Sequence, residues 1–161
     1  SPRAGVRFDL LGLGPVRTAW VAGEDELLAL DRNGNGRIDD GSELFGEGTD
    51  LGGAPAADGF AALAQLDLPQ QGGNGNGRVD GGDLMFDALR VWTDDNRDGI
   101  SQPGELRGLT GVGITPLGTA GAESCGTITD AHGNDLSLRG RFTRADGRRG
   151  LVVDVLFASG R

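Results

Sequence analysis

The chain has 161 residues, enough for one domain or two small ones, and a formal net charge of −9 from 15 basic and 24 acidic residues. The acid excess argues against a nucleic-acid partner, because phosphate binding needs clustered positive charge. The sequence holds no apolar run long enough to span a membrane, and the single cysteine, Cys125, excludes an internal disulfide. The first eight residues lack the apolar stretch of a signal peptide, which leaves open that a leader is removed from a longer precursor.

The first part of the chain reads as short helices that alternate with acidic loops. Asp58 is a suitable N-cap for one of these helices, in which Phe60, Leu63 and Leu66 share a face. The pattern predicts helical segments at residues 24–30, 43–46, 59–66, 84–89 and 105–109. Their arrangement on both sides of acidic loops is the helix–loop–helix layout of an EF-hand.

The sequence changes character after about residue 112, where β-rich runs begin. These runs are 127–130, 135–143 and 151–157, with turn signals at 132–134 and 145–147. We expect a β-hairpin packed on the helical part. The fold class predicted is therefore α+β, in a single domain over residues 1–161. Its parts are an N-terminal segment with a degenerate loop (1–23), EF-hand-like calcium loops (24–111) and a β-hairpin region (112–161).

Three short segments rich in Asp, Asn and Gly carry the strongest functional signal. They hold five of the six asparagines and recur as an internal repeat. A Ca²⁺ ion takes six to eight oxygen ligands, which an EF-hand loop supplies from positions 1, 3, 5, 7, 9 and 12, with Gly at 6 for the sharp turn. The carbonyl at position 7 is a backbone ligand, so any residue type can stand there.

Loops 1 and 3 fit this template closely. The ligands predicted for loop 1 are Asp31, Asn33, Asn35, the carbonyl of Arg37, Asp39 and Glu43. Glu43 stands at position 13, and a one-residue bulge would bring it to the ion. The ligands predicted for loop 3 are Asp94, Asn96, Asp98, the carbonyl of Ile100 and Glu105.

Loop 2 is less complete. Its predicted ligands are Asn74, Asn76, the carbonyl of Arg78, Asp80 and Asp83. Position 1 is Gly72, and the nearest acid, Asp67, precedes it by five residues, as if residues 69–73 were an insertion. Two to three Ca²⁺ ions are therefore expected, with loop 2 weaker or empty. The alternative is that the Asn-Gly and Asp-Gly runs are merely turns.

The loops and their flanks resemble the calcium-binding self-processing module of RTX proteins of the FrpC type. The resemblance covers residues 17–157 and includes Trp92 and the Ser42-Glu-Leu-Phe run as well as the loops. It implies a secreted, extracellular bacterial module that folds with calcium. Neighbouring domains of a larger RTX-like or adhesin-like protein are then its candidate partners.

Two departures from the family pattern bear on activity. Family members that self-process cut an Asp-Pro bond when calcium binds, and the new aspartyl end can join a lysine. This chain has neither an Asp-Pro dipeptide nor a lysine. The N-terminal loop, Phe8–Gly14, keeps one acid and is expected to be a structural remnant. We therefore expect calcium binding without an enzymatic step. The alternatives are a processing module whose cleavage site lies outside this chain and a calcium-regulated partner-binding protein.

Overall fold

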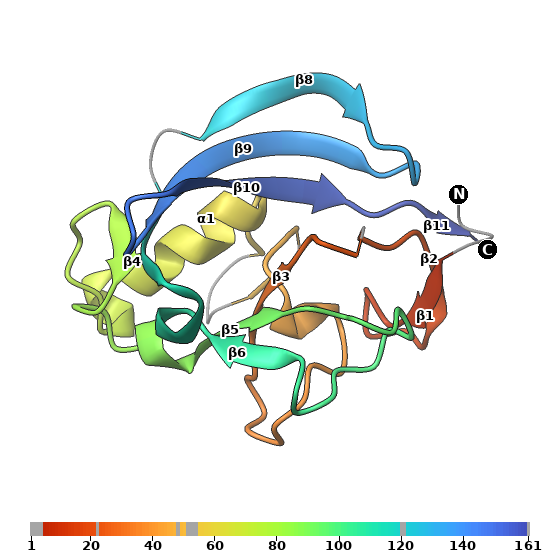
Figure 1. Cartoon of the computed structure of the whole chain (residues 1–161), viewed down its shortest axis with the longest axis horizontal. Helices are drawn as coiled ribbons and strands as arrows, with labels where there is room; N and C mark the ends of the chain where they lie inside the picture. The colour runs from red at the N-terminus through yellow and green to blue at the C-terminus, as the bar shows by residue number, and fades with distance from the viewer. Residues whose placement is uncertain (1–4, 22, 48, 51–54, 120–121, 161) are drawn as a thin grey trace.

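The computed structural model describes residues 5–21, 23–47, 49–50, 55–119 and 122–160, and these are built mostly from β-strands (Figure 1). The strands are β1 (Val6–Phe8), β2 (Val16–Thr18), β3 (Leu27–Leu30), β4 (Arg78–Asp80), β5 (Leu89–Trp92), β6 (Leu106–Gly108), β7 (Ile114–Gly118), β8 (Glu123–Thr129), β9 (Asp135–Arg144), β10 (Arg149–Leu156) and β11 (Ser159–Gly160). The described residues hold one α-helix, α1 (Gly59–Ala64). Short 3-10 helices lie at Gly41–Glu43, Gln65–Asp67, Pro69–Gln71, Phe86–Ala88 and Thr110–Val112.

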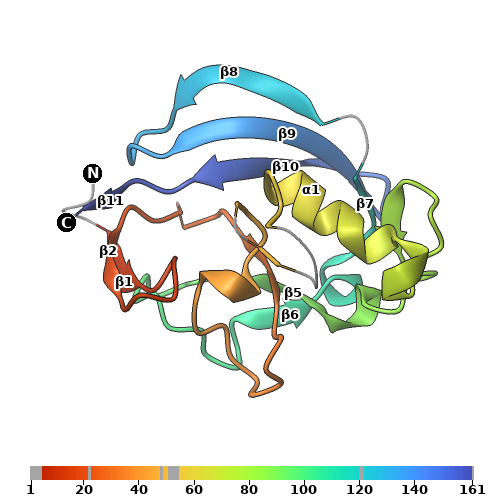
Figure 2. The same ribbon diagram turned by 180° about the vertical axis from the view of Figure 1, so that it is seen from behind.

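The strands form three antiparallel sheets. The largest has the order β10-β9-β7-β4, with β8 also paired to β9. The second has the order β3-β5-β6, and the third, β1-β2-β11, joins the two ends of the described chain. Figures 1 and 2 show β8, β9 and β10 as a curved layer on one side of α1 and the β3-β5-β6 sheet on the other.

The predicted α+β fold class, with EF-hand helix–loop–helix units, is wrong, because the described residues form mostly strands. The segment 24–30 contains strand β3, the segment 105–109 contains strand β6, and only a 3-10 turn forms within 84–89. The reason is the length of the apolar runs. A run of four or five residues is too short to nucleate a stable helix, and its apolar pattern is equally compatible with a buried strand. Leu27 pairs with Trp92 in the β3–β5 ladder, which satisfies the backbone of both runs.

Two predicted features are present. Asp58 caps α1 by accepting the N–H of Ala61 at 2.7 Å, and the chain continues from α1 into a 3-10 helix that ends at Asp67. The β-rich runs after residue 112 are strands, and β9 and β10 form the long hairpin, with Phe142 opposite Gly150. These runs are eight to ten residues long with strong turn signals between them, so local sequence determines them.

The buried side chains divide into two clusters. One is aromatic and contains Phe8, Trp20 and Trp92, with ring centroids 5.2 to 5.8 Å apart. The other is aliphatic and lies between α1, β4, β5 and β7, where Phe142 and Val152 of the hairpin also pack. Ile38 of loop 1 belongs to the aromatic cluster, whereas Val79 of loop 2 belongs to the aliphatic one. Loops 1 and 2 therefore rest on different parts of the core.

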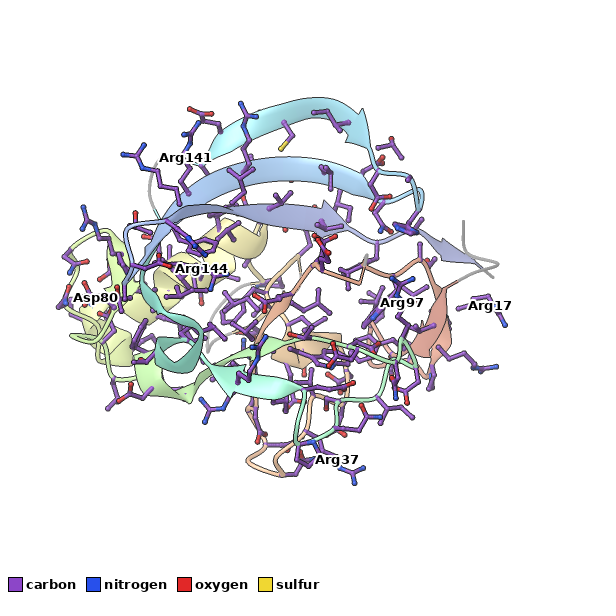
Figure 3. The ribbon with its side chains drawn as sticks, viewed as in Figure 1. Arg17, Arg37, Asp80, Arg97, Arg141 and Arg144 are labelled. Carbon is purple, nitrogen blue, oxygen red and sulfur yellow. The ribbon has the colours of Figure 1, made fainter. Side chains whose placement is uncertain are left out.

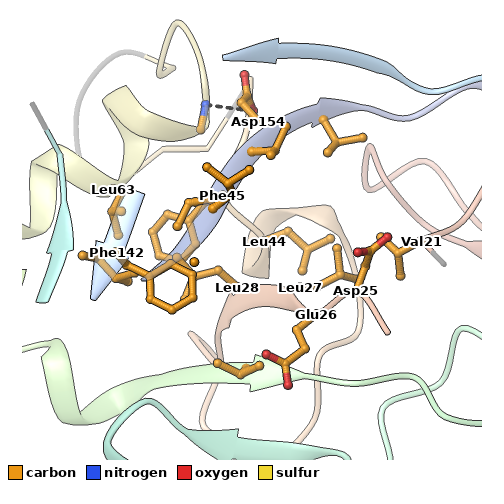
Figure 4. Close-up of a pocket in the computed structure, with 18 of the residues that line it drawn as sticks. Val21, Asp25, Glu26, Leu27, Leu28, Leu44, Phe45, Leu63, Phe142 and Asp154 are labelled. Atoms are coloured by element: carbon orange, nitrogen blue, oxygen red, sulfur yellow. Dashed lines mark hydrogen bonds between the residues drawn. The ribbon is translucent and has the colours of Figure 1, made fainter. Parts of the chain in front are cut away.

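A cavity of about 540 Å³ separates β10 from the segment that carries β3 (Figure 4). Apolar side chains such as Leu28 and Phe45 line it, and Asp154 lies at its edge. The Asp154 carboxylate accepts hydrogen bonds from Ser137 Oγ at 2.9 Å and from the Gly59 N–H at 3.3 Å. Burial in these surroundings raises the pKa of the Asp154 carboxyl and outweighs the two hydrogen bonds.

Replacing Asp154 with Asn is expected to remove a pH-dependent loss of stability. A carboxyl with a raised pKa holds its proton more tightly in the folded chain than in the unfolded chain. The free energy of unfolding therefore falls as pH rises from the ordinary Asp pKa of about 4 to the raised pKa of Asp154. The Asp154→Asn variant lacks this slope and should be the more stable of the two chains at neutral pH. Urea unfolding between pH 4 and 8 measures it, with Asp87→Asn at an exposed position as the control. Parallel stability curves for the original chain and the Asp154→Asn variant would contradict the expectation.

Candidate metal-binding loops

The first acid of loops 1 and 3 organises the loop backbone in the same way. Asp31 accepts the N–H groups of the residues four and five positions later, at 3.2 and 2.7 Å. Asp94 accepts the corresponding two N–H groups at 3.2 and 2.9 Å. The second donor in each case is the position-6 glycine, with φ of +81° at Gly36 and +72° at Gly99, a region that favours glycine. The loops thus have the turn expected of a calcium loop without the helices around it.

The last acid closes each of these loops. Glu43 accepts the N–H at position 2 at 3.0 Å and the N–H at position 9 at 2.8 Å. Glu105 accepts the same pair, each at 3.1 Å. The extra residue in loop 1 is absorbed before Glu43, within the 3-10 helix Gly41–Glu43. Both residues are buried, 2% and 8% exposed.

Loop 2 is completed by Asp67, which the predicted ligand set for that loop left out. Asp67 accepts the N–H groups of Asn76 at 3.0 Å and Gly77 at 2.7 Å, as Asp31 and Asp94 do in their own loops. Asp83 closes loop 2 through the N–H groups of Asn74 at 2.9 Å and Asp80 at 2.7 Å. Loop 2 therefore has three carboxylates, although the sequence suggested two.

An insertion explains why the spacing hid Asp67. The 3-10 turn Pro69–Gln71 carries the extra residues outward, and the chain returns to hydrogen-bond the Asp67 carbonyl from the Gly75 N–H at 2.8 Å. A Cβ on Gly73 would lie 2.1 Å from the Asp67 carbonyl carbon, so only glycine fits this return. The signal available in the sequence was an acid upstream of an otherwise complete loop.

The asparagine amides of the loops donate hydrogen bonds to loop carboxylates. In loop 1, Asn33 and Asn35 donate Nδ2 hydrogen bonds to Asp39 at 3.1 and 2.6 Å, and these bonds lower the pKa of the Asp39 carboxyl. Hydrogen bonds from Gly82 and Asn76 likewise lower the pKa of the half-buried Asp80 carboxyl. Carboxylates held in this way stay ionised and available as hard oxygen ligands.

The structure therefore brings most predicted ligands together within their loops. The groups are Asp31, Asn33, Asn35, Asp39 and Glu43; Asp67, Asn74, Asn76, Asp80 and Asp83; and Asp94, Asn96, Asp98 and Glu105. Across the described ranges, no group of three or more His, Cys, Asp or Glu side chains stands ready-made as a metal site. The loop carboxylates accept hydrogen bonds instead, mainly from backbone and Asn N–H groups, and also from Gln102 Nε2 to Asp98 and Trp92 Nε1 to Glu105. The carbonyls of Arg37, Arg78 and Ile100 remain predicted ligands.

Five of the loop acids are buried, which is unusual for charged groups. They are Glu43, Asp67, Asp83, Asp94 and Glu105, each 8% exposed or less. The four ion pairs formed among the described residues involve other acids, namely Glu26, Glu123 and Asp146. Buried carboxylates cost free energy unless a cation or strong hydrogen bonds compensate them. This arrangement suits a bound cation.

The N-terminal loop has the same backbone turn without the ligands. Asp9 accepts the N–H groups of Leu13 at 3.0 Å and Gly14 at 2.9 Å, the same two positions that Asp31 serves. Leucines stand at positions 3 and 5, where Leu11 and Leu13 are 76% and 87% exposed. Its acid therefore serves to hold the turn.

Figure 3 shows how the loops are distributed. Arg37 marks loop 1 at the bottom of the view, Asp80 marks loop 2 at the far left, and Arg97 marks loop 3 on the right. Loops 1 and 2 thus lie on different sides of the molecule. No helix in the described part of the chain has the length and apolarity needed to cross a bilayer.

Comparison with known proteins supports part of the family resemblance described above. The chain is 43% identical over 159 residues to the iron-regulated protein FrpA of Neisseria meningitidis serogroup C. The match covers 97% of this chain and 14% of FrpA, so the chain spans a small part of that relative's length. The model of the SPM domain matches residues 1–158. The chain therefore belongs to the SPM domain family.

Proposed function

We propose that this chain is a calcium-binding module that Ca²⁺ folds and stabilises, and that it works as part of a larger exported RTX-like protein. The observation that carries the proposal is the pair of first and last acids that recurs in three loops, with five of these carboxylates buried. The residues fit a calcium ion, because each loop offers carboxylate, amide and carbonyl oxygens, the hard ligands that Ca²⁺ selects. Bound Ca²⁺ would supply the positive charge that compensates these acids.

The residues that would hold the ion follow from the loop geometry. Asp31, Asp67 and Asp94 provide position 1, and Glu43, Asp83 and Glu105 close the loops. Each Asn Oδ1 accepts one backbone N–H, such as Arg37 N–H to Asn35 at 2.9 Å, and keeps a second lone pair for a ligand role. Loop 2 is expected to be the weakest of the three, because the Asp83 side chain is one methylene shorter than Glu43 or Glu105.

The expected calcium affinity of the loops determines in which compartment they fill. Extracellular calcium modules bind at roughly 0.1–1 mM, so such sites would be empty in a low-calcium cytoplasm and filled outside the cell. A chain that folds only when its loops bind calcium would stay unfolded until export. The resemblance to FrpA, of which this chain matches a small part, supports a module within a longer protein.

Calorimetric titration with calcium tests the proposal directly. Two to three ions are expected to bind per chain, and replacing Glu43 with Gln should remove one of them. Glu24→Gln, an exposed acid outside the loops, is the matched control. Absence of calcium binding, or a stoichiometry unaffected by Glu43→Gln, would overturn the proposal.

The second candidate function is calcium-triggered self-processing, which the family resemblance brings. Calcium is expected to leave this chain intact, because it has no Asp-Pro bond and no lysine to accept an aspartyl group. Intact-mass measurement after incubation with millimolar calcium checks this, with an EDTA-treated sample as the control. A fragment that forms only with calcium would favour the processing function instead.

A further inference from the structure

A buried serine hydroxyl connects loops 1 and 3. Ser101 Oγ accepts the N–H of Ile38 at 2.7 Å and donates to the Ile38 carbonyl at 3.3 Å, across 63 residues of sequence. Both residues are 2% exposed. One hydroxyl therefore satisfies both backbone groups of the central apolar residue of loop 1.

Ile38 and Ser101 each precede a residue whose backbone N–H donates to the closing glutamate of its loop. Ile38 precedes Asp39, whose N–H donates to Glu43 Oε2 at 2.8 Å. Ser101 precedes Gln102, whose N–H donates to Glu105 Oε2 at 3.1 Å. One peptide unit, Ile38–Asp39 or Ser101–Gln102, thus separates each glutamate's hydrogen bond from the Ser101 hydrogen bonds. Movement of either glutamate would therefore displace the Ser101 contact.

Loop 2 has no such link to the other two among the described residues. Its residue equivalent to Ile38 is Val79, which pairs with Leu117 in the β4–β7 ladder. Val79 is also part of the aliphatic cluster, whereas Ile38 packs in the aromatic cluster. Coupling through the core should therefore join loops 1 and 3 and leave loop 2 separate.

We propose that Ser101 is a positioning residue that makes calcium binding at loops 1 and 3 mutually dependent, while loop 2 binds independently. This inference rests on the proposed calcium function and concerns its regulation. Coupling of this kind is reciprocal, since each ion must raise the affinity of the other site by the same factor. The pair then fills over a narrower calcium range than two independent sites would.

The test needs a separate signal for each loop. The N–H groups of Gly36, Gly77 and Gly99 donate to the first acid of loops 1, 2 and 3 at 2.7, 2.7 and 2.9 Å. Their amide resonances in a nitrogen-15 NMR titration with calcium therefore report each loop by itself. If none of the three responds to calcium, the proposed function fails. If all respond but loops 1 and 3 are independent, only the coupling fails.

A double-mutant cycle then isolates the contribution of Ser101. Asp98→Ala removes an exposed ligand of loop 3, and it is expected to raise the calcium Kd of loop 1 by about fivefold or more. In a Ser101→Ala background the same change should move the loop 1 Kd less than about twofold. Ser124→Ala, which removes a hydroxyl that accepts the Gly126 N–H within β8, is the control background and should keep the full effect. An effect of Asp98→Ala that is equal with and without the Ser101→Ala change would overturn the proposal.

Hydrogen exchange keeps the proposal testable should Ser101→Ala not fold. Asn35→Ala disables loop 1 at an exposed ligand, and calcium bound at loop 3 should still slow exchange of the Ile38 amide, because that amide donates to Ser101. The Val79 amide of loop 2 serves as the internal control and is expected to respond only when loop 2 fills. An Ile38 amide exchange rate that does not change when calcium binds at loop 3 would refute the coupling.

Discussion

Removing calcium with EDTA is expected to lower the melting temperature of this chain by about 15–30 °C, or to leave it unfolded at room temperature. Binding to the native state alone adds about 2.7 kcal/mol per site at a hundredfold excess over Kd, so three sites add about 8 kcal/mol. That is a large share of a typical stability of about 5–15 kcal/mol, and each kcal/mol moves Tm by about 2–4 °C at this chain length. Circular dichroism melts in EDTA and in excess calcium measure the difference.

The control for this experiment separates calcium from ionic strength. Magnesium at the same concentration should recover little of the lost stability, because Mg²⁺ demands a tighter octahedral site and dehydrates reluctantly. Adding calcium back after EDTA should restore the original melt. Equal melting temperatures with EDTA and with calcium would mean that the loops are ordinary turns.

Replacing Asp67 with Ala is expected to destabilise the calcium-loaded chain by about 3–5 kcal/mol and to abolish binding at loop 2. The carboxylate is 6% exposed and accepts the N–H groups of Asn76 and Gly77, which would lose their shared acceptor. The Gly77 N–H would be left without this acceptor, at a cost of about 1–3 kcal/mol, whereas the Asn76 N–H keeps Asn74 Oδ1 at 3.1 Å. The binding energy of one ion is lost in addition. Urea unfolding in calcium, together with the Gly77 amide titration, measures both effects.

Asp87→Ala is the matched control, because it removes a carboxylate at an exposed position of the neighbouring 3-10 helix. It should change stability by no more than about 0.5 kcal/mol and leave calcium binding at loop 2 intact. The interpretation of Asp67 as the first acid of loop 2 is refuted if Asp67→Ala and Asp87→Ala behave alike.

The loops could be located from sequence because their information is local. The Asp-x-Asn-x-Asn-Gly spacing of loop 1 predicts both the ligand positions and the glycine turn, and the structure forms that turn. The long hairpin was predictable for the same reason. Its strands are long and alternate in burial, and turn residues separate them.

One feature escaped prediction and a second, the role of Asp67, was left open, because both depend on residues far apart. The run Leu27–Leu30 is a strand only because Leu89–Trp92 lies beside it, and neither run alone distinguishes strand from helix. Asp67 belongs to loop 2 only because the turn Pro69–Gln71 folds out of the way and Gly73 lets the backbone pass closely. Tertiary contacts decided both cases.

The small sheet β1-β2-β11 governs how mechanical tension would travel through a longer protein that carries this module. Thr18 pairs with Val6 on one side and with Ser159 on the other, so the two ends of the described chain leave from one place. A pull on the flanking segments would therefore load these few strand pairs first and bypass loops 1, 2 and 3.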